Sequence, residues 1–216
     1  MKYVRIILLV LALILAGTCF FQWRQYRKQL DLRRQGLLYF SEEDYAKAID
    51  YLEEATGMHS VFSGDIVTDM KEYLAESHMK LEEYEEAVDL YDDLIREDPD
   101  AVRYYVLKSE CLTSSGDEEG AGEVLRRGYE KTGDSGLLLT LCERYLSEKN
   151  YEEALACAEE GGKAGDENAA DFLFTRVVIY EKQGDYQSAL KACKEYTDLY
   201  PDDEKGQKEY TFLSTR

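Results

Sequence analysis

The side chains that most often perform catalysis or bind metals are sparse in this chain of 216 residues. Two histidines occur, His59 and His78, and neither has a further ligand nearby at a spacing that would complete a metal site. The five cysteines lack the Cys-x-x-Cys spacing of zinc sites and redox pairs. We therefore expect no metal site, and we assign neither histidine a catalytic role.

Motifs for phosphate binding and nucleophilic catalysis are not found either. The sequence has no glycine-rich phosphate loop and no nucleophile elbow, and the loose Gly120-Ala121-Gly122 lies within a predicted helix. No stretch outside the repeats described below is long enough for a catalytic domain, which leaves substrate docking as the one catalytic alternative. We expect no enzyme, no cofactor and no small-molecule substrate.

Four cysteines stand at apolar or small-residue places of helical stretches, where a thiol packs as a small apolar group. They are Cys111, Cys142, Cys157 and Cys193. A Cys142–Cys157 disulfide is the one pairing to test if the domain is extracytoplasmic. We expect all four to fill the core.

A repeated alanine indicates the elements that must position any functional residues. The alanines are Ala48, Ala87, Ala121, Ala154 and Ala189, at intervals of 39, 34, 33 and 35 residues. A tyrosine stands three residues before the alanine in four of the five units, and the third unit has Glu118 there. A period near 34 residues is typical of stacked helical hairpins, in which an alanine allows two backbones to approach closely.

The pattern resembles the tetratricopeptide repeat family, whose unit has a small residue in its first helix, a Gly-Asp-Tyr turn, an alanine early in its second helix and often a closing proline. The small residues here are Gly36, Ala75 and Ser109, with Cys142 and Val177 in the last two units. The two prolines of the chain, Pro99 and Pro201, both fall at the closing position. The resemblance covers roughly residues 29–203.

The resemblance implies an all-α, right-handed solenoid of about five helix-turn-helix repeats. We expect the repeats at residues 29–62, 68–101, 102–135, 135–168 and 170–203. The expected helix pairs are 30–42 with 45–57, 65–80 with 84–97, 101–114 with 117–131, 134–148 with 151–163, and 167–183 with 186–199. A closing helix is expected at about 202–214, and the C-terminal capping segment is assigned to 204–216. The longer first interval places about five extra residues in the loop from Gly57 to Gly64.

Residues 1–28 form a separate, apolar segment. The stretch from Tyr3 to Trp23 supplies about the 20 residues that a helix needs to cross a bilayer. We favour a membrane anchor, and two alternatives stay open: a cleaved signal, and a lipoprotein signal whose lipidated residue is Cys19, although Thr18 departs from the usual small residue before that cysteine. No proline or glycine occurs between Phe20 and Gln35, so we expect this helix to continue into the first repeat.

The expected localisation is the plasma membrane, by a single-pass anchor. The excess of Lys and Arg after the apolar run favours repeats on the cytoplasmic side. The start of the chain, a short basic stretch followed by an apolar core, is similar to a signal peptide and favours the opposite side. The side that the repeats face stays open.

Charge divides the chain into two parts. Of the 26 basic and 45 acidic residues, the first 34 positions hold seven and one, so the remainder holds 19 and 44 and has a net charge of −25. Such an acidic domain repels a phosphate backbone, which argues against a nucleic-acid partner. It favours basic partners, although most of the acids are expected only to solvate helix faces.

The resemblance assigns binding to a concave face formed by the first helix of each hairpin. The residues projected there are Arg33, Leu37, Phe40, Glu72, Tyr73, Glu76, Met79, Val106, Glu110, Leu139, Glu143, Leu146, Phe174 and Val178. The expected anchors are Phe40, Tyr73, Leu139 and Phe174, although each aromatic could instead serve only packing between repeats. The expected charge partners are Glu72, Glu76, Glu110 and Glu143. The Lys and Asn pattern that holds a peptide carboxylate in one well-known family groove is not present.

These observations favour a membrane-tethered scaffold or chaperone-like adaptor that binds a protein or peptide. The mixture of apolar and acidic residues on the predicted face suits a basic or amphipathic segment. The alternative is a purely structural role, in which neighbouring solenoids assemble with one another.

Overall fold

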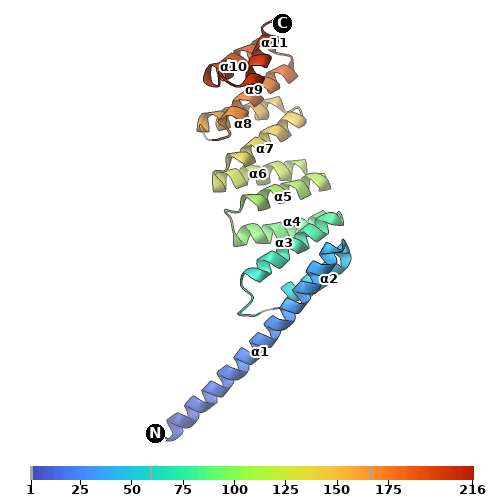
Figure 1. Ribbon diagram of the computed structural model, residues 1–216, viewed down its shortest axis with the longest axis vertical. Helices are drawn as coiled ribbons and strands as arrows, with labels where there is room; N and C mark the ends of the chain where they lie inside the picture. Colours follow the sequence, from blue (N-terminus) through green and yellow to red (C-terminus); the bar gives the residue numbers. More distant parts are fainter. Residues whose placement is uncertain (1, 59, 166) are drawn as a thin grey trace. The chain divides into compact units, whose positions relative to one another are not determined.

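The computed structural model describes residues 2–58, 60–165 and 167–216, and within them the chain forms eleven helices and no strand (Figure 1). The helices are α1 (Lys2–Ser41), α2 (Tyr45–Thr56), α3 (Asp65–Lys80), α4 (Tyr84–Glu97), α5 (Val102–Ser115), α6 (Glu118–Thr132), α7 (Ser135–Ser147), α8 (Tyr151–Ala164), α9 (Ala169–Gln183), α10 (Tyr186–Leu199) and α11 (Glu204–Leu213). The all-α prediction is confirmed, and the predicted helix ends agree within two residues except at the start of the first. His59 lies outside the described residues.

The helices form two compact units. The first consists of Met1–Asp98 with Ser114–Gly116, and the second of Pro99–Thr113 with Asp117–Arg216. Helices α1 to α4 therefore build the first unit, and α5 to α11 build the second.

The turn inside each hairpin has one shared conformation. The residue two places before the tyrosine position has a positive φ in all five turns: Glu43, Glu82, Gly116, Lys149 and Gly184. An aspartate then caps the second helix in three of the hairpins, because the side chains of Asp44, Asp117 and Asp185 accept a hydrogen bond from a backbone N–H of the first turn. The repeated turn explains why the second helices begin at a fixed distance from the alanine.

The five alanines of the repeat are fully buried in the structure. Four of the small residues expected in the first helices are also buried: Ala75, Ser109, Cys142 and Val177. At the fifth, Gly36, a Cβ atom would stand 2.7 Å from Cγ of Leu52. A larger side chain at these positions would therefore push the helices apart.

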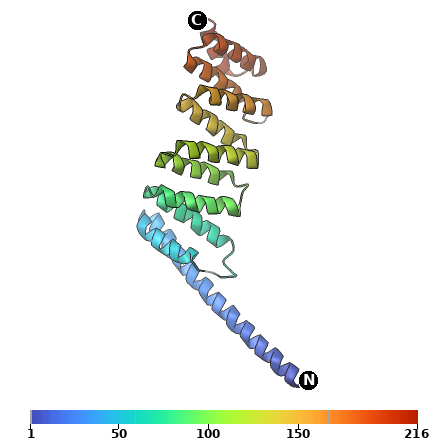
Figure 2. The same cartoon turned by 180° about the vertical axis from the view of Figure 1, so that it is seen from behind.

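In the first unit, the C-terminal part of α1 packs against α2 and α3. Leu52, Ala55, Met70 and Leu74 form the core between these helices. The N-terminal part of α1 extends beyond the packed helices of this unit (Figure 2). Its large apolar side chains are exposed. The prediction that the apolar helix continues into the first repeat is confirmed, because α1 is one helix from Lys2 to Ser41.

In the second unit, α11 covers the last hairpin. Leu213 is 2% exposed and packs with Val177, Ala189 and Cys193 in one core cluster. Asp203 caps the helix by accepting hydrogen bonds from the backbone N–H groups of the first turn. The segment therefore acts as the predicted capping helix, which shields an apolar face that would otherwise meet water.

All five cysteines are free thiols. Cys111, Cys142, Cys157 and Cys193 are buried, which confirms that they fill the core. Burial raises the pKa of the Cys142 thiol to about 12, and its Sγ donates a hydrogen bond to the carbonyl oxygen of Ala154 at 3.3 Å. A thiol in this state is a poor nucleophile at neutral pH.

Candidate functional site

Two predicted anchors of the first unit meet in space. The ring of Phe40 on α1 packs edge-on against the ring of Tyr73 on α3, with centroids 5.1 Å apart. It also contacts Tyr45 at the start of α2, at 5.5 Å. Both Phe40 and Tyr73 are half-buried, so each ring supports the packing and still presents an edge to solvent.

Acidic and apolar side chains flank these rings in the first unit. Glu76 is exposed and Glu72 is half-buried, and both belong to α3. Leu37 and Met79 are half-buried as well. Met79 does part of the packing, because its sulfur accepts a hydrogen bond from the Tyr91 hydroxyl at 3.3 Å.

The basic residue projected onto this face is already paired. Nε of Arg33 donates a hydrogen bond to a carboxylate oxygen of Asp69 at 2.7 Å. The pair joins α1 to α3, and both side chains are about one-third exposed. Arg33 therefore contributes to the contact between the helices.

The predicted groove residues of the second unit divide into two groups. Val106, Leu139, Leu146 and Val178 are half-buried on α5, α7 and α9, and Glu110 and Glu143 are exposed. Phe174 differs from them, because it is only 8% exposed and packs edge-on against Tyr196 at 5.3 Å. The ammonium group of Lys205 lies 3.9 Å from the centroid of the same ring. The structure thus gives Phe174 the packing role that was the alternative for the aromatics.

The side chain of His78 also has a structural contact. Its ring is 6% exposed, and Nδ1 lies 2.7 Å from a carboxylate oxygen of Glu83, the residue before α4. In the described part of the chain, no group of three or more His, Cys, Asp or Glu side chains is arranged to hold a metal ion.

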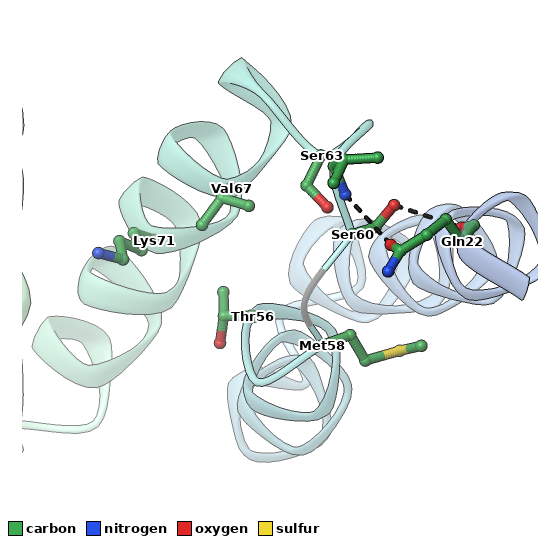
Figure 3. Close-up of a pocket in the computed structure, with 8 residues that line it drawn as sticks. Gln22, Thr56, Met58, Ser60, Ser63, Val67 and Lys71 are labelled. Atoms are coloured by element: carbon green, nitrogen blue, oxygen red, sulfur yellow. Dashed lines mark hydrogen bonds between the residues drawn. The ribbon is translucent and has the colours of Figure 1, made fainter. Parts of the chain in front are cut away.

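The loop between α2 and α3 forms a pocket together with α1 (Figure 3). The pocket has a volume of about 540 Å³. Its lining residues are Gln22, Thr56, Met58, Ser60, Val61, Ser63, Val67 and Lys71. The extra residues of the first interval thus build a feature that the sequence did not predict.

Hydrogen bonds attach the tip of this loop to α1. The Ser60 hydroxyl donates a hydrogen bond to the backbone oxygen of Gln22, and the backbone N–H of Val61 donates one to the side-chain oxygen of Gln22. Both distances are 3.3 Å (Figure 3). The ring of Phe62 lies 6.1 Å from the ring of Tyr26, centroid to centroid. The loop tip is therefore fixed at residues 22–26 of α1.

One turn further along α1, Gln29 fixes both ends of the loop. Its side chain has no exposed surface, and its Nε2 donates to the backbone oxygens of Ala55 at 2.9 Å and Met58 at 3.2 Å. Its Oε1 accepts a hydrogen bond from the Ser63 hydroxyl at 2.5 Å. A buried amide with this many partners specifies one loop conformation.

The charged group at the pocket wall is neutralised by neighbours. Burial lowers the pKa of Lys71, but hydrogen bonds to Glu97 and Asp93 outweigh it and raise the pKa above its usual value. The ammonium group lies 2.6 Å from Glu97 and 3.2 Å from Asp93. The other described lining residues contribute hydroxyl, amide and apolar groups.

Within the described residues, one helix is long and apolar enough to cross a membrane. It is α1, and none of its most apolar stretch is buried in the structure. Cys19 is exposed on this stretch. A signal sequence satisfies the same criteria of length and composition, so the anchor stays a prediction.

Comparison with known families and structures gives a consistent result. A family model described as tetratricopeptide repeat matches residues 74–135 and 140–204, more than half of the chain. A second model with the same description matches residues 34–58.

Three similar proteins illustrate the match. The TPR repeat-containing protein YpiA of Bacillus subtilis is 26% identical over 166 residues, which cover 77% of this chain but only 38% of that protein. A crystal structure of a TPR repeats protein from Bacteroides fragilis superposes with a TM-score of 0.63 at 14% identity, over 87% of this chain and 98% of that one. YrrB, described as a TPR protein with an unusual peptide-binding site, superposes with a TM-score of 0.50 at 17% identity, over 82% and 88%. At these identities the two structures show a shared fold.

Proposed function

Since the chain belongs to the tetratricopeptide repeat family, we propose that it is a membrane-tethered interaction scaffold or chaperone-like adaptor that binds basic or amphipathic peptide segments. A repeat fold of this kind offers a surface for protein partners rather than a catalytic centre. We propose accordingly that the chain is not an enzyme.

One observation carries the proposed binding: a half-buried aromatic pair, Phe40 on α1 and Tyr73 on α3, lies beside acidic side chains of α3. Tyr73 contacts Phe40 and stands beside Glu72, one helical turn before the exposed Glu76. Rings of this kind provide apolar area, and neighbouring carboxylates select a cationic side chain and disfavour an anionic one. YrrB, which shares the fold and is described as having a peptide-binding site, supports a peptide as the ligand.

The tether rests on the exposed apolar part of α1. Side chains from Tyr3 to Phe21 include many large aliphatic residues that are about half exposed or more. An apolar surface of this size is unfavourable in water and suits the hydrocarbon of a bilayer. Lipidation of the exposed Cys19 is the alternative means of attachment.

A charge-reversal variant tests the binding proposal. In the full chain, Glu72, Glu76, Glu110 and Glu143 are changed to Lys, and fluorescence anisotropy measures binding of a labelled basic amphipathic peptide and of the same peptide with Glu in place of Lys. We expect the wild type to bind only the basic peptide and the variant to lose this binding, because attraction becomes repulsion.

The matched control reverses four exposed acids on second helices, and they are Asp50, Asp89, Glu123 and Glu130. It changes the net charge by the same amount outside the predicted face. Equal loss of binding in both variants would show that only net charge matters, and unchanged binding in the first variant would refute the groove. Circular dichroism checks that helicity is retained.

Attachment is tested by fractionation of cells that express the full chain, with alkaline carbonate extraction. A spanning helix predicts that the wild type and a Cys19→Ser variant both stay in the membrane pellet. Release of only the variant, together with palmitate labelling of the wild type, would indicate a lipid anchor. Release of both would contradict a tether of either kind.

The self-assembly alternative is tested by light scattering on a chain that begins at Gln22, so that its contacts with the loop are kept. A monomer at micromolar concentration that still binds the basic peptide supports the scaffold. Concentration-dependent oligomers without peptide binding would favour self-assembly.

A further inference from the structure

We propose that the tip of the loop between α2 and α3, Val61 with Phe62, is a second membrane contact that inserts into the interfacial zone of the bilayer beside α1. This inference rests on the proposed anchoring of α1. It adds a lipid-binding surface on the repeat domain itself, contributed by residues about 40 positions after the span.

The loop tip contacts α1 at the position where the predicted membrane span ends. Exposed apolar side chains begin at Tyr3, and a hydrocarbon core of about 30 Å takes about 20 residues of helix at about 1.5 Å each. A span that starts at Tyr3 therefore ends at Gln22, and a span that starts at Ile6, after Arg5, ends at Gln25. Gln22 is the residue to which the loop tip is hydrogen-bonded. The tip thus lies at the level where hydrocarbon gives way to headgroups.

The two side chains at the tip are apolar and face solvent. Val61 is 78% exposed and Phe62 is 49% exposed. The connection between α6 and α7 in the second unit has instead Gly133 and Asp134, as expected for a turn in water. An exposed valine and phenylalanine in continuity with an exposed apolar helix form one surface that suits an apolar medium.

The tip is held in place rather than free to fold back. Gln29 fixes the start and the end of the loop from a fully buried position, and the Tyr26 ring supports that of Phe62. A loop that is already ordered loses little conformational entropy when it inserts. Trp23 and Tyr26 are the residue types that prefer the same interfacial zone.

Charge at this level fits lipid headgroups. The first 30 residues contain no acid, and Arg24, Arg27 and Lys28 stand within six positions after Gln22. The Arg27 guanidinium lies 5.8 Å from the centre of the Trp23 ring, and Lys28 pairs with Glu54 at 2.6 Å. Basic side chains beside an apolar tip suit phosphate headgroups, whereas the acidic remainder of the chain suits basic peptides. We therefore assign a bilayer to this surface.

Two attachment points restrict α1 more than a single span does. A lone helix rotates about its own axis, and its tilt is set by interfacial anchors and by packing. The loop tip lies to one side of α1 and would fix its rotation. The repeat surface would then keep one orientation toward the membrane.

Tryptophan fluorescence in vesicles tests the proposal on the full chain. Trp23 is the only tryptophan, so it reports insertion of α1 by itself. In a Trp23→Phe background, Val61→Trp and Phe62→Trp each place a probe at the tip. Leu81→Trp is the matched control, because Leu81 is also exposed in the first unit and follows α3, about 24 Å along that 16-residue helix. The vesicles contain phosphatidylcholine and some phosphatidylglycerol, brominated near the carbonyl end of the acyl chains.

The proposal predicts that both tip probes lose emission to the brominated lipid and shift to the blue, as Trp23 does, whereas the Leu81→Trp probe keeps its emission. Quenching of Trp23 without quenching of the tip probes would overturn the second contact and leave the anchor intact. Failure to quench Trp23 would overturn both. Equal quenching at the control position would show that the whole unit lies on the bilayer and would overturn the assignment to the loop tip.

Discussion

The two ends of the repeat array are built on the same hairpin but differ in what they leave exposed. At the N-terminal end, the first repeat helix continues into an apolar stretch without burial, and the next connection has a valine and a phenylalanine at its tip. At the C-terminal end, α11 covers the last hairpin and buries Leu213. A solenoid needs a polar cap wherever it ends in water. The N-terminal end is therefore suited to a second, apolar environment.

The polar groups that secure the two ends differ as well. A neutral amide, Gln29, holds the first loop by three hydrogen bonds. The last hairpin brings together two carboxylates, Glu181 on α9 and Glu209 on α11, near the C-terminal Arg216. The first arrangement is independent of pH, and the second is not.

The largest predicted effect comes from removing the amide. Gln29→Leu keeps a buried side chain of similar size but removes the amide partner of the Met58 oxygen and of the Ser63 hydroxyl, whereas the Ala55 oxygen still accepts a hydrogen bond from the backbone N–H of Met58. We expect a cost of about 3 kcal/mol of unfolding free energy. Chemical denaturation measures this loss, and hydrogen exchange should show faster exchange in residues 60–63. Gln25→Leu, at a half-buried position of the same helix, is the control. The loss should be equal at acid and neutral pH, and a variant as stable as the wild type would contradict the role of Gln29.

A smaller loss of stability is predicted for a substitution in α6, where a glycine packs closely against neighbouring helices. Gly128→Ala would place a Cβ atom 2.7 Å from Cγ of Tyr105 and 2.8 Å from a methyl group of Leu137. Such overpacking costs about 2 kcal/mol. Gly122→Ala is the matched control on the same helix, because its Cβ would lie at an ordinary 3.5 Å from Leu141.

For Gly122→Ala we expect a gain of about 0.5–1 kcal/mol, since alanine loses less backbone entropy than glycine in a helix. Thermal melting of the two variants and the wild type measures both changes in stability, the loss in Gly128→Ala and the gain in Gly122→Ala. Two variants that shift the melting temperature in the same direction would contradict this description of α6.

Most of the fold could be predicted from the sequence because its signals are local. The alanines, the capping aspartates and the closing prolines are signals that act within a single repeat. From them, most helix ends could be predicted within two residues. The continuity of α1 followed from the absence of helix breakers between residues 20 and 35. Short-range patterns of this kind are the most reliable part of a sequence.

The contacts of the first loop could not be predicted, because they join residues far apart in the chain. Gln22 bonds residues 38 and 39 positions away, and Gln29 bonds Ser63 across 34 positions. The only signal in the sequence was the excess length of the first interval. This length predicts where the loop lies in the chain, but it does not predict the conformation of the loop. The sequence left open whether Phe174 packs or binds, because its partners Tyr196 and Lys205 belong to later helices.

The smallest predicted effect is a pH dependence at the C-terminal end. Burial, followed by a hydrogen bond and repulsion from Glu209, raises the pKa of Glu181 from 4.5 to about 7, and Arg216 and Lys182 oppose part of this shift. The folded chain therefore binds a proton more tightly than the unfolded chain in this range. By linkage, the free energy of unfolding falls as pH rises between these two values, so the contribution is present at acid pH and is lost above neutral pH.

Glu181→Gln removes the titrating group and keeps an amide that can hydrogen-bond Glu209. We expect the variant to melt at a higher temperature than the wild type above neutral pH, and the difference to shrink toward zero near pH 4.5, where the wild-type carboxyl is protonated. Measuring the difference between the two proteins cancels the titration of the many other acids. A difference in melting temperature that stays constant between pH 4.5 and neutral pH would contradict the raised pKa of Glu181. Together with a Gln29→Leu loss that does not change with pH, the expected result would show that the contact between α9 and α11 depends on protonation and that the contact made by Gln29 does not.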